Sequence, residues 1–142
     1  IQKYMAKISG PLLDRIDIHI EVPAVKYKDL SSKSYGEKSE DIRKRVITAR
    51  DVQLERFKNY KNVFNNGDMV SKEVRTFCKL DDQSEELLKM AMTKLGLSAR
   101  AYDRILKVSR TIADLEKSES ILPQHISEAI QYRSLDRELW KH

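Results

Sequence analysis

The sequence predicts a mainly α-helical fold, in which a helical bundle over residues 37–142 follows a short helix and one strand. Two observations carry this prediction. Apolar residues recur at spacings of three and four along much of the chain after residue 37, which is the period of helices that are buried on one face. Strict alternation of apolar and polar residues occurs at residues 16–22, and it predicts the strand.

Residues 1–25 combine a helix start with this strand pattern. Ser9, Gly10 and Pro11 form a helix-start signal, because proline suits the first helical position. The alternation that follows ends at Pro23. A strand this short needs partner strands, and we find no other convincing strand in the sequence. We therefore expect residues 16–22 to be frayed or packed against the helices.

Residues 26–36 are polar and serine-rich, and we expect them to form a linker. A long helix should follow from Glu37 to about Tyr60. Its apolar stripe, which we expect to be buried, consists of Ile42, Val46, Ala49, Val52, Gln53, Leu54 and Phe57. Interleaved acids favour a solvated face for its basic residues, which are Lys38, Arg43, Lys44, Arg45, Arg50, Arg56, Lys58 and Lys61. A DNA-contacting surface is the alternative, and its binding would fall steeply with salt.

Capping signals predict two further helices in the middle of the chain. Ser71 is a suitable N-cap for a short helix that ends at about Lys79. Asp82 with Glu85 resembles a capping box, which opens the second helix. Gly96 should end that helix, because glycine adopts the left-handed conformation of a helix C-terminus most readily.

The C-terminal part of the chain predicts one long helix and one short helix. Ser98 should cap a helix over residues 99–116, whose expected buried stripe is Ile105, Val108, Ile112 and Leu115. Pro123 marks the start of the next helix, which has Ile126, Ala129 and Ile130 on one face. Residues 135–140 are expected to add a final turn.

Composition narrows the class of protein. The net charge of +5 over 142 residues permits nucleic-acid binding without arguing strongly for it. The sequence has neither an apolar run long enough to span a bilayer nor a secretion signal, so we expect a cytoplasmic protein with no membrane partner. By itself, this chain is expected to be monomeric. Cys78 is the only cysteine, and we expect it to be a buried core residue.

The residues that would form a complete catalytic site are missing from the sequence. No G-x-x-x-x-G-K-[ST] phosphate-binding loop is present. His19, His125 and His142 are too scattered to predict a metal site. We therefore expect this chain alone to be inactive as an ATPase, and to bind no cofactor or metal by itself.

Three segments resemble one protein family. SGPLLDRIDIHIEVP at residues 9–23 looks like the magnesium-chelatase-like branch of the AAA+ ATPases, the YifB/ComM type. LSARAYDRILKVSRTIADL at residues 97–115 and ILPQHISEAIQYRSLDR at residues 121–137 are similar to the same family. The resemblance implies that the chain is a C-terminal fragment, with residues 1–25 as the edge of the α/β ATPase core, 26–36 as a linker and 37–142 as the helical lid.

The resemblance also implies roles for arginine residues. Arg15 corresponds to a trans-acting arginine finger, where a guanidinium stabilises charge on the γ-phosphate of the neighbouring subunit's nucleotide. The alternative is a surface arginine held between Asp14 and Asp17. Arg100 corresponds to the sensor-2 arginine, which contacts nucleotide bound by its own subunit, and Arg104 is the second choice for that role.

Other polar residues of these segments have simpler interpretations. A solvated face with i,i+4 pairs, such as Asp103 with Lys107 and Arg110 with Asp114, is the alternative for the basic residues of the helix over 99–116. We interpret four residues near the C-terminus as packing and local pairing, namely His125, Glu128, Tyr132 and Arg133.

For function, the resemblance implies that the full-length protein uses ATP and Mg²⁺, forms a homo-oligomeric ring, and remodels DNA as competence or branch-migration motors do. Two alternatives remain open. One is the motor subunit of a metal chelatase, and the other is a helical protein- or DNA-binding module with no link to ATP.

Overall fold

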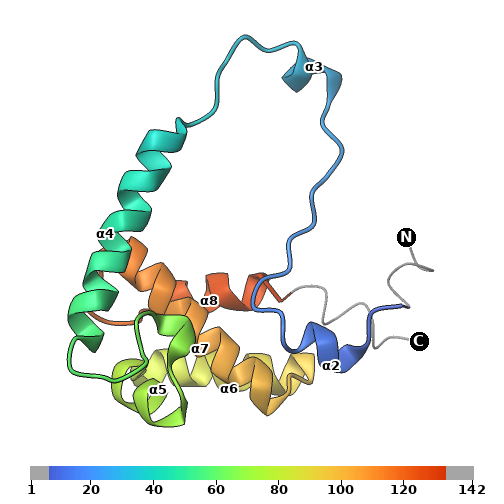
Figure 1. Ribbon diagram of the computed structural model, residues 1–142. Coiled ribbons are helices and arrows are strands. Elements are labelled where there is room, and N and C mark those ends of the chain that lie inside the picture. The colour runs from blue at the N-terminus through green and yellow to red at the C-terminus, as the bar shows by residue number, and fades with distance from the viewer. Residues whose placement is uncertain (1–6, 134–142) are drawn as a thin grey trace.

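The computed structural model describes residues 7–133, and it confirms the mainly α-helical fold (Figure 1). The elements in chain order are α2 (Gly10–Leu13), α3 (Tyr27–Leu30), α4 (Ser39–Phe57), η1 (Asn66–Asp68), α5 (Ser71–Phe77), α6 (Asp82–Leu95), α7 (Ala99–Leu115) and α8 (Pro123–Gln131). The final turn expected at residues 135–140 lies outside the described residues.

The helix α7 is the centre of the bundle. It packs against α8, α4, α5 and η1, and α6 closes the bundle by packing against α8. The apolar core between these elements includes Ile105 of α7, Leu88 of α6 and Ile126 of α8, which are each at most 2% exposed. The stripe predicted for α7 is buried at Ile105 and Ile112, whereas Leu115 at the helix end is 41% exposed.

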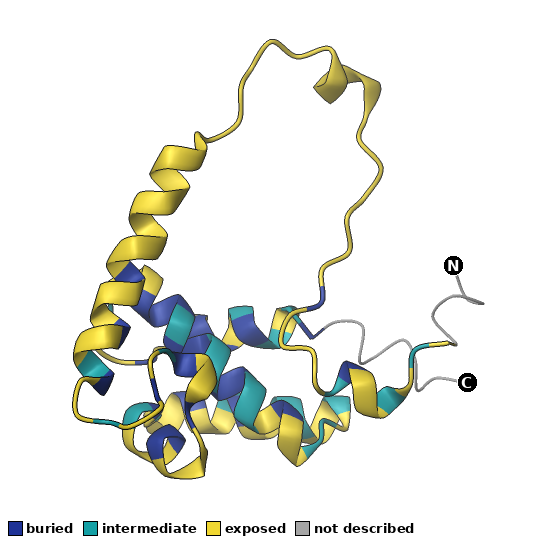
Figure 2. Cartoon of the chain, viewed as in Figure 1, coloured by how far each residue is buried: buried dark blue, intermediate teal, exposed yellow. Residues whose placement is uncertain are grey.

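The helix α4 is longer than the bundle that covers it. Ala49, Gln53 and Phe57 in its C-terminal half are buried, as predicted. Val52 and Leu54 of the same half are 41% and 49% exposed, so the prediction of a buried stripe is wrong for them. It is also wrong for the N-terminal half, where Ile42 and Val46 are 42% and 44% exposed. The reason is geometric, because this half of α4 projects beyond the other helices and has nothing to pack against (Figure 2).

The strand predicted at residues 16–22 does not form. Within residues 7–133 no other strand is available to pair with it, so the apolar alternation has no sheet to join, and Ile20 and Val22 are 66% and 82% exposed. The expected packing against the helices does occur at His19, whose side chain is 5% exposed. Its backbone N–H donates to the carbonyl of Tyr132 at 2.6 Å.

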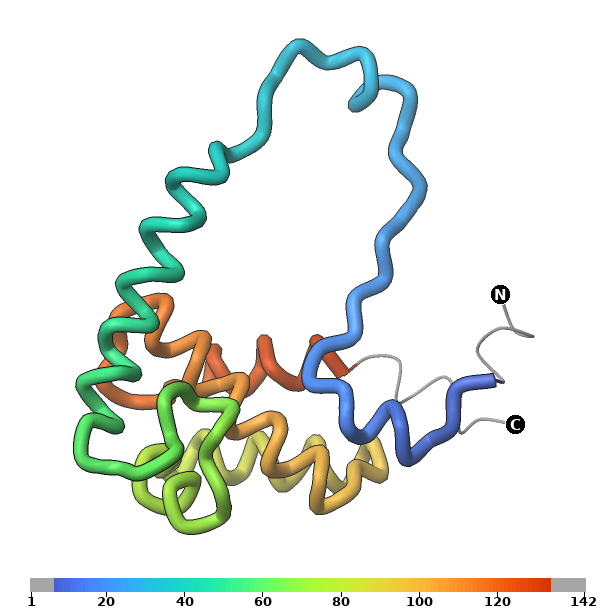
Figure 3. Tube along the Cα trace, in the orientation of Figure 1, coloured from blue at the N-terminus to red at the C-terminus, as the bar shows by residue number. Residues whose placement is uncertain are grey.

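Residues 20–38 then leave the bundle as an exposed loop that contains the single turn α3 (Figure 3). This is the segment that contains the predicted linker over residues 26–36. No residue from 20 to 48 is buried, so the N-terminal segment and α4 are joined by chain that contributes nothing to the core.

Local capping chemistry explains the helix ends in the middle of the chain. The N-cap of α5 is Val70 rather than Ser71, and its N–H is satisfied by the Glu73 carboxylate at 3.0 Å. The N-cap of α6 is Asp81 rather than Asp82, because Asp81 Oδ1 is placed to accept from the N–H of Ser84 at 2.7 Å. Gly96 ends α6 in the left-handed conformation, as predicted, with φ of 60°.

Candidate functional site

The N-terminus of α7 carries the first of the predicted arginine residues. Gly96 reverses the chain after α6, and Ser98 caps α7 by accepting from the N–H of Ala101 at 3.2 Å. Arg100 therefore lies in the first turn of a long helix, where the helix dipole adds positive charge. Its side chain is exposed, and it makes no hydrogen bond or ion pair within the described part of the chain.

Arg104 lies one turn further along the same face of α7. Its Nη1 atom donates to Asp17 Oδ1 at 2.7 Å, and the side chain is 35% exposed. This ion pair connects α7 to the N-terminal segment, so that α2 and the residues after it lie beside the start of α7 (Figure 1).

Arg15 lies in the turn that follows α2. The turn is closed by hydrogen bonds of 3.0 Å from Arg15 N to Leu12 O and from Ile16 N to Leu13 O. The Arg15 side chain is exposed, and it pairs with neither neighbouring acid in the described residues, because Asp17 pairs with Arg104 and Asp14 lies 4.0 Å from Arg133. No hydrogen bond or ion pair joins Arg15 to Arg100 there.

The polar residues predicted to pair locally along α8 do so at both of its ends. The Tyr132 hydroxyl donates to Glu128 Oε1 at 2.6 Å, and this contact raises the pKa of Tyr132. His125 Nδ1 accepts from the N–H of Leu122 at 2.9 Å, so its Nε2 donates to Glu116 at 2.7 Å. The hydrogen bond from His125 lowers the pKa of Glu116.

Arg133 contacts residues far away in the sequence, whereas its position predicts local pairing. Its side chain is 1% exposed, and it donates from Nη1 to the carbonyl of Ile16 at 2.6 Å. A second donation, from Nη2 to the carbonyl of Leu13, spans 3.4 Å. No sequence signal could have identified these contacts, because a backbone carbonyl carries no residue type that a pattern could match.

A buried polar network that the sequence did not reveal lies between α4 and α7. The side chain of Asp114 is fully buried and accepts two hydrogen bonds from Arg56, at 2.8 and 2.5 Å. Arg110 donates to the same carboxylate at 3.2 Å, which confirms the predicted i,i+4 pair, and Asn66 donates to it at 2.9 Å. The interpretation of Arg56 as part of a solvated face is therefore wrong. The sequence signal for its burial is that Arg56 follows the predicted buried residue Gln53 by three positions, which places both on the same face of the helix.

Burial also shifts the pKa of Arg110, a member of this network, and of the nearby Cys78. Desolvation lowers the pKa of Arg110, against the attraction of Asp114. Desolvation raises the pKa of the buried Cys78 thiol to about 11, so Cys78 is a neutral core residue, as predicted. The predicted pair of Lys107 with Asp103 is not formed, because Lys107 donates instead to the carbonyl of Gly67 at 3.1 Å.

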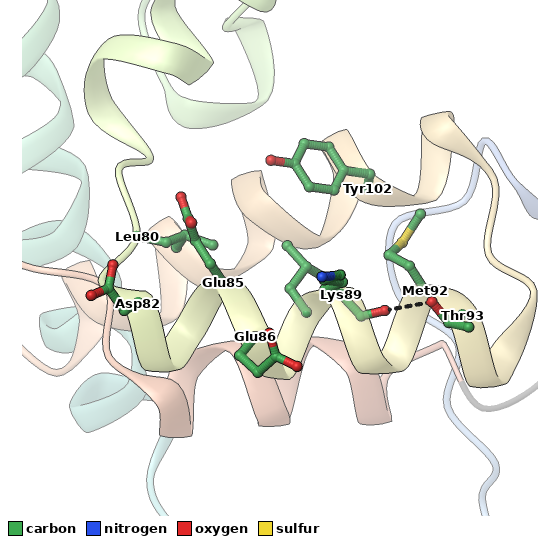
Figure 4. A pocket seen from close by; sticks show the side chains of 9 residues that line it. Leu80, Asp82, Glu85, Glu86, Lys89, Met92, Thr93 and Tyr102 are labelled. Carbon is green, nitrogen blue, oxygen red and sulfur yellow. Dashed lines mark hydrogen bonds between the residues drawn. The ribbon is translucent and has the colours of Figure 1, made fainter.

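A surface pocket of about 690 Å³ lies along α6, and none of the three predicted arginine residues is among those that line it (Figure 4). Its rim carries the acids Asp82, Glu85 and Glu86, and Tyr102 of α7 closes one side. Within residues 7–133 no group of three or more histidine, cysteine or acidic residues is arranged to hold a metal ion. None of the helices described there has the length and apolar character needed to cross a membrane.

Comparison with known proteins identifies the family. The family described as magnesium chelatase, subunit ChlI C-terminal, matches residues 36–133, and the one described as magnesium chelatase, subunit ChlI, matches residues 1–30. The chain is 44% identical over 142 residues to competence protein ComM of Haemophilus influenzae, which covers 99% of this chain and 27% of ComM. It is 41% identical over 136 residues to the protein YifB of Escherichia coli, which covers 95% of this chain and 26% of YifB. The chain thus spans about a quarter of the length of these relatives. It belongs to the magnesium chelatase ChlI family, and most of its length is the C-terminal domain of that family.

Proposed function

We propose that this chain is the lid region of a AAA+ ATPase that senses nucleotide and couples ATP hydrolysis to the remodelling of DNA. The observation that carries the proposal is the position of Arg100. Its guanidinium lies on the first turn of α7 and pairs with no residue between 7 and 133, and the helix N–H groups and dipole there favour a phosphate. ATP and Mg²⁺ are the proposed cofactors of the full-length protein, and a homo-oligomeric ring is its proposed assembly.

Arg100 suits the sensor-2 role better than Arg104 does. The guanidinium of Arg104 is engaged by Asp17, and contact with a phosphate would break that pair. Arg100 has no partner to lose within the described residues, so its donors are available to the γ-phosphate at no cost in existing contacts.

Arg15 suits the trans-acting role, because it is exposed and lies in a turn whose backbone is fixed by hydrogen bonds. A guanidinium in a defined position can stabilise charge that develops on a γ-phosphate bound by the neighbouring subunit, and such an arginine contributes about 10³- to 10⁵-fold to turnover in related chemistry.

The test is a pair of substitutions in the full-length protein. Arg15→Ala should abolish hydrolysis while ATP still binds, and Arg100→Ala should weaken ATP binding and turnover together. Arg75→Ala removes an exposed arginine of α5 and serves as the control, for which we expect unchanged kinetics. Unchanged turnover in Arg15→Ala or Arg100→Ala would remove that residue from the mechanism.

The substrate is the second part of the proposal. The name of ComM as a competence protein supports DNA, whereas the family description supports the motor subunit of a metal chelatase. Binding of the full-length protein to duplex DNA at increasing salt separates the two, because phosphate contacts release counterions and weaken steeply with salt. Binding that is absent, or insensitive to salt, would favour the chelatase motor.

A further inference from the structure

The end of α8 holds the backbone on both sides of Arg15. The Arg133 guanidinium, which is buried, donates to the carbonyl of Ile16 at 2.6 Å and to the carbonyl of Leu13 at 3.4 Å. These carbonyls belong to the residue directly after Arg15 and to the residue two positions before it. Arg133 also lies 4.0 Å from the Asp14 carboxylate, so its positive charge has an acidic neighbour in the same turn.

Neighbouring contacts extend this attachment in both directions. The N–H of His19 donates to the carbonyl of Tyr132 at 2.6 Å, and His19 Nε2 lies 3.3 Å from the carbonyl of Leu13. The Leu13 side chain is 4% exposed. Residues 13–19 are therefore tied to two consecutive residues at the end of α8, while residues 20–48 are exposed.

We infer that Arg133 is a positioning residue for Arg15. It ties the Arg15 turn to the bundle, so that the trans-acting arginine moves as one rigid unit with the helix that carries Arg100. The ion pair of Arg104 with Asp17 joins the same turn directly to α7. A change of nucleotide contact at Arg100 would then alter the position of the arginine that acts on the neighbouring subunit. This inference rests on the proposed roles of Arg15 and Arg100.

An arginine suits this task for a chemical reason. Its guanidinium is planar and carries several donors in a fixed fork, so one side chain reaches two carbonyls of one turn. A buried cation also needs hydrogen bonds to offset its desolvation, and the two carbonyls supply them. Without this attachment the turn could shift, and displacement of a catalytic group by about 1 Å can lower turnover by about 10²-fold.

The experiment compares Arg133→Met with Arg110→Met. Both remove a buried guanidinium, but the hydrogen bonds of Arg110 go to Asp114, Ser118 and Glu119 within the bundle. The first readout is amide hydrogen exchange at Ile16 and His19, measured on this chain. We expect exchange at both amides to be at least about tenfold faster in Arg133→Met than in Arg110→Met.

The second readout is steady-state ATP turnover by the full-length protein. We expect Arg133→Met to lower kcat by about 10²-fold with little change in KM, because only the position of Arg15 is altered. Arg133→Lys keeps the charge and can reach one carbonyl, so it should restore part of both readouts. It also serves as the test variant if Arg133→Met does not fold.

The outcomes are distinguishable. Exchange that is no faster in Arg133→Met than in the Arg110→Met control overturns the inference. The inference is also overturned by a second combination of results. In this combination, Arg133→Met speeds exchange at Ile16 and His19 but keeps the kcat of the full-length protein, while Arg15→Ala loses turnover. If Arg15→Ala itself keeps full turnover, the proposed role of Arg15 is wrong, and the positioning role falls with it even where the exchange data show the attachment.

Discussion

The guanidinium of Arg56 and the carboxylate of Asp114 form two parallel hydrogen bonds, although the two residues are 58 positions apart in the sequence. The pair joins the C-terminal half of α4 to the C-terminal end of α7. The Asp114 side chain is fully buried and that of Arg56 is 13% exposed, so both charges are largely shielded from water. Arg110 adds a second cation on the same carboxylate, which makes Asp114 the only negative charge among the three side chains.

Replacement of Asp114 by asparagine should strongly destabilise the chain. The substitution leaves the guanidinium groups of Arg56 and Arg110 buried without a counter-charge, which typically costs about 3–5 kcal/mol. Urea unfolding measures the change in the free energy of unfolding. Glu86→Gln removes an equal charge from the exposed face of α6, and we expect it to stay within about 0.5 kcal/mol of the unmodified chain. Equal losses in both variants would contradict the prediction.

Stability should also depend on pH through Cys78. Its pKa is raised from 9.0 to about 11, because burial penalises the thiolate. The folded state therefore holds the thiol proton more tightly than the unfolded state does. This contribution to stability is fully present below about pH 9 and is lost as the pH rises through about 11. Unfolding in urea at pH 8 to 11 should show a shallower decline for Cys78→Val than for the unmodified chain.

The same burial should protect the thiol from reagents. At pH 8 we expect iodoacetamide to react with Cys78 at least about 100-fold more slowly in the folded chain than in urea, since only the thiolate is the nucleophile. A folded-state rate close to that of the unfolded chain would mean that the thiol is accessible and not desolvated.

Truncation of two isoleucine residues should change the free energy of unfolding by very different amounts. Ile126 is fully buried in α8, and Ile126→Ala should cost about 2–5 kcal/mol through lost burial and a cavity. Ile20 belongs to the failed strand pattern and is 66% exposed, so Ile20→Ala should change the free energy of unfolding by less than about 0.5 kcal/mol. A large effect at Ile20 would show that this segment is packed in solution.

The left-handed turn between α6 and α7 gives a further prediction. Gly96 has φ of 60°, a conformation that costs a residue with a Cβ about 1–2 kcal/mol. Gly96→Ala should therefore lower the thermal midpoint, although no atom lies within 4 Å of the added Cβ. Gly36→Ala is the matched control, because Gly36 also has open space but no positive φ, and it should be neutral or slightly stabilising.

The elements that the sequence predicted well depend on local chemistry. The end of α6 at Gly96 and the start of α7 after Ser98 follow from the backbone conformation of one residue and the side-chain oxygen of another. The strand at residues 16–22 was predicted wrongly for the opposite reason. Alternation describes a surface that suits a sheet, but pairing depends on a neighbouring strand, which the described residues do not supply.

The candidate site was predictable only in part. The exposure of Arg15 and Arg100 agrees with their proposed roles, which await the kinetic tests. The contacts of Arg133 could not be predicted, because its acceptors are carbonyls 117 and 120 positions away. The prediction for Arg56 is wrong because alternation of charges does not fix which side of a helix faces the bundle. Arg56 lies three residues after the buried Gln53, on the side of α4 from which it reaches Asp114.

The exposed loop over residues 20–38 has a consequence for how the chain tolerates change. Attachment of residues 13–19 to α8 closes a ring of chain between Ile16 and Arg133. The entropy lost on closing a flexible ring grows only with the logarithm of its length, so that a doubling costs about 0.6 kcal/mol. Residues inserted into or removed from this loop should therefore hardly alter the attachment. A longer or shorter connection should leave the Arg15 turn in its place on the bundle.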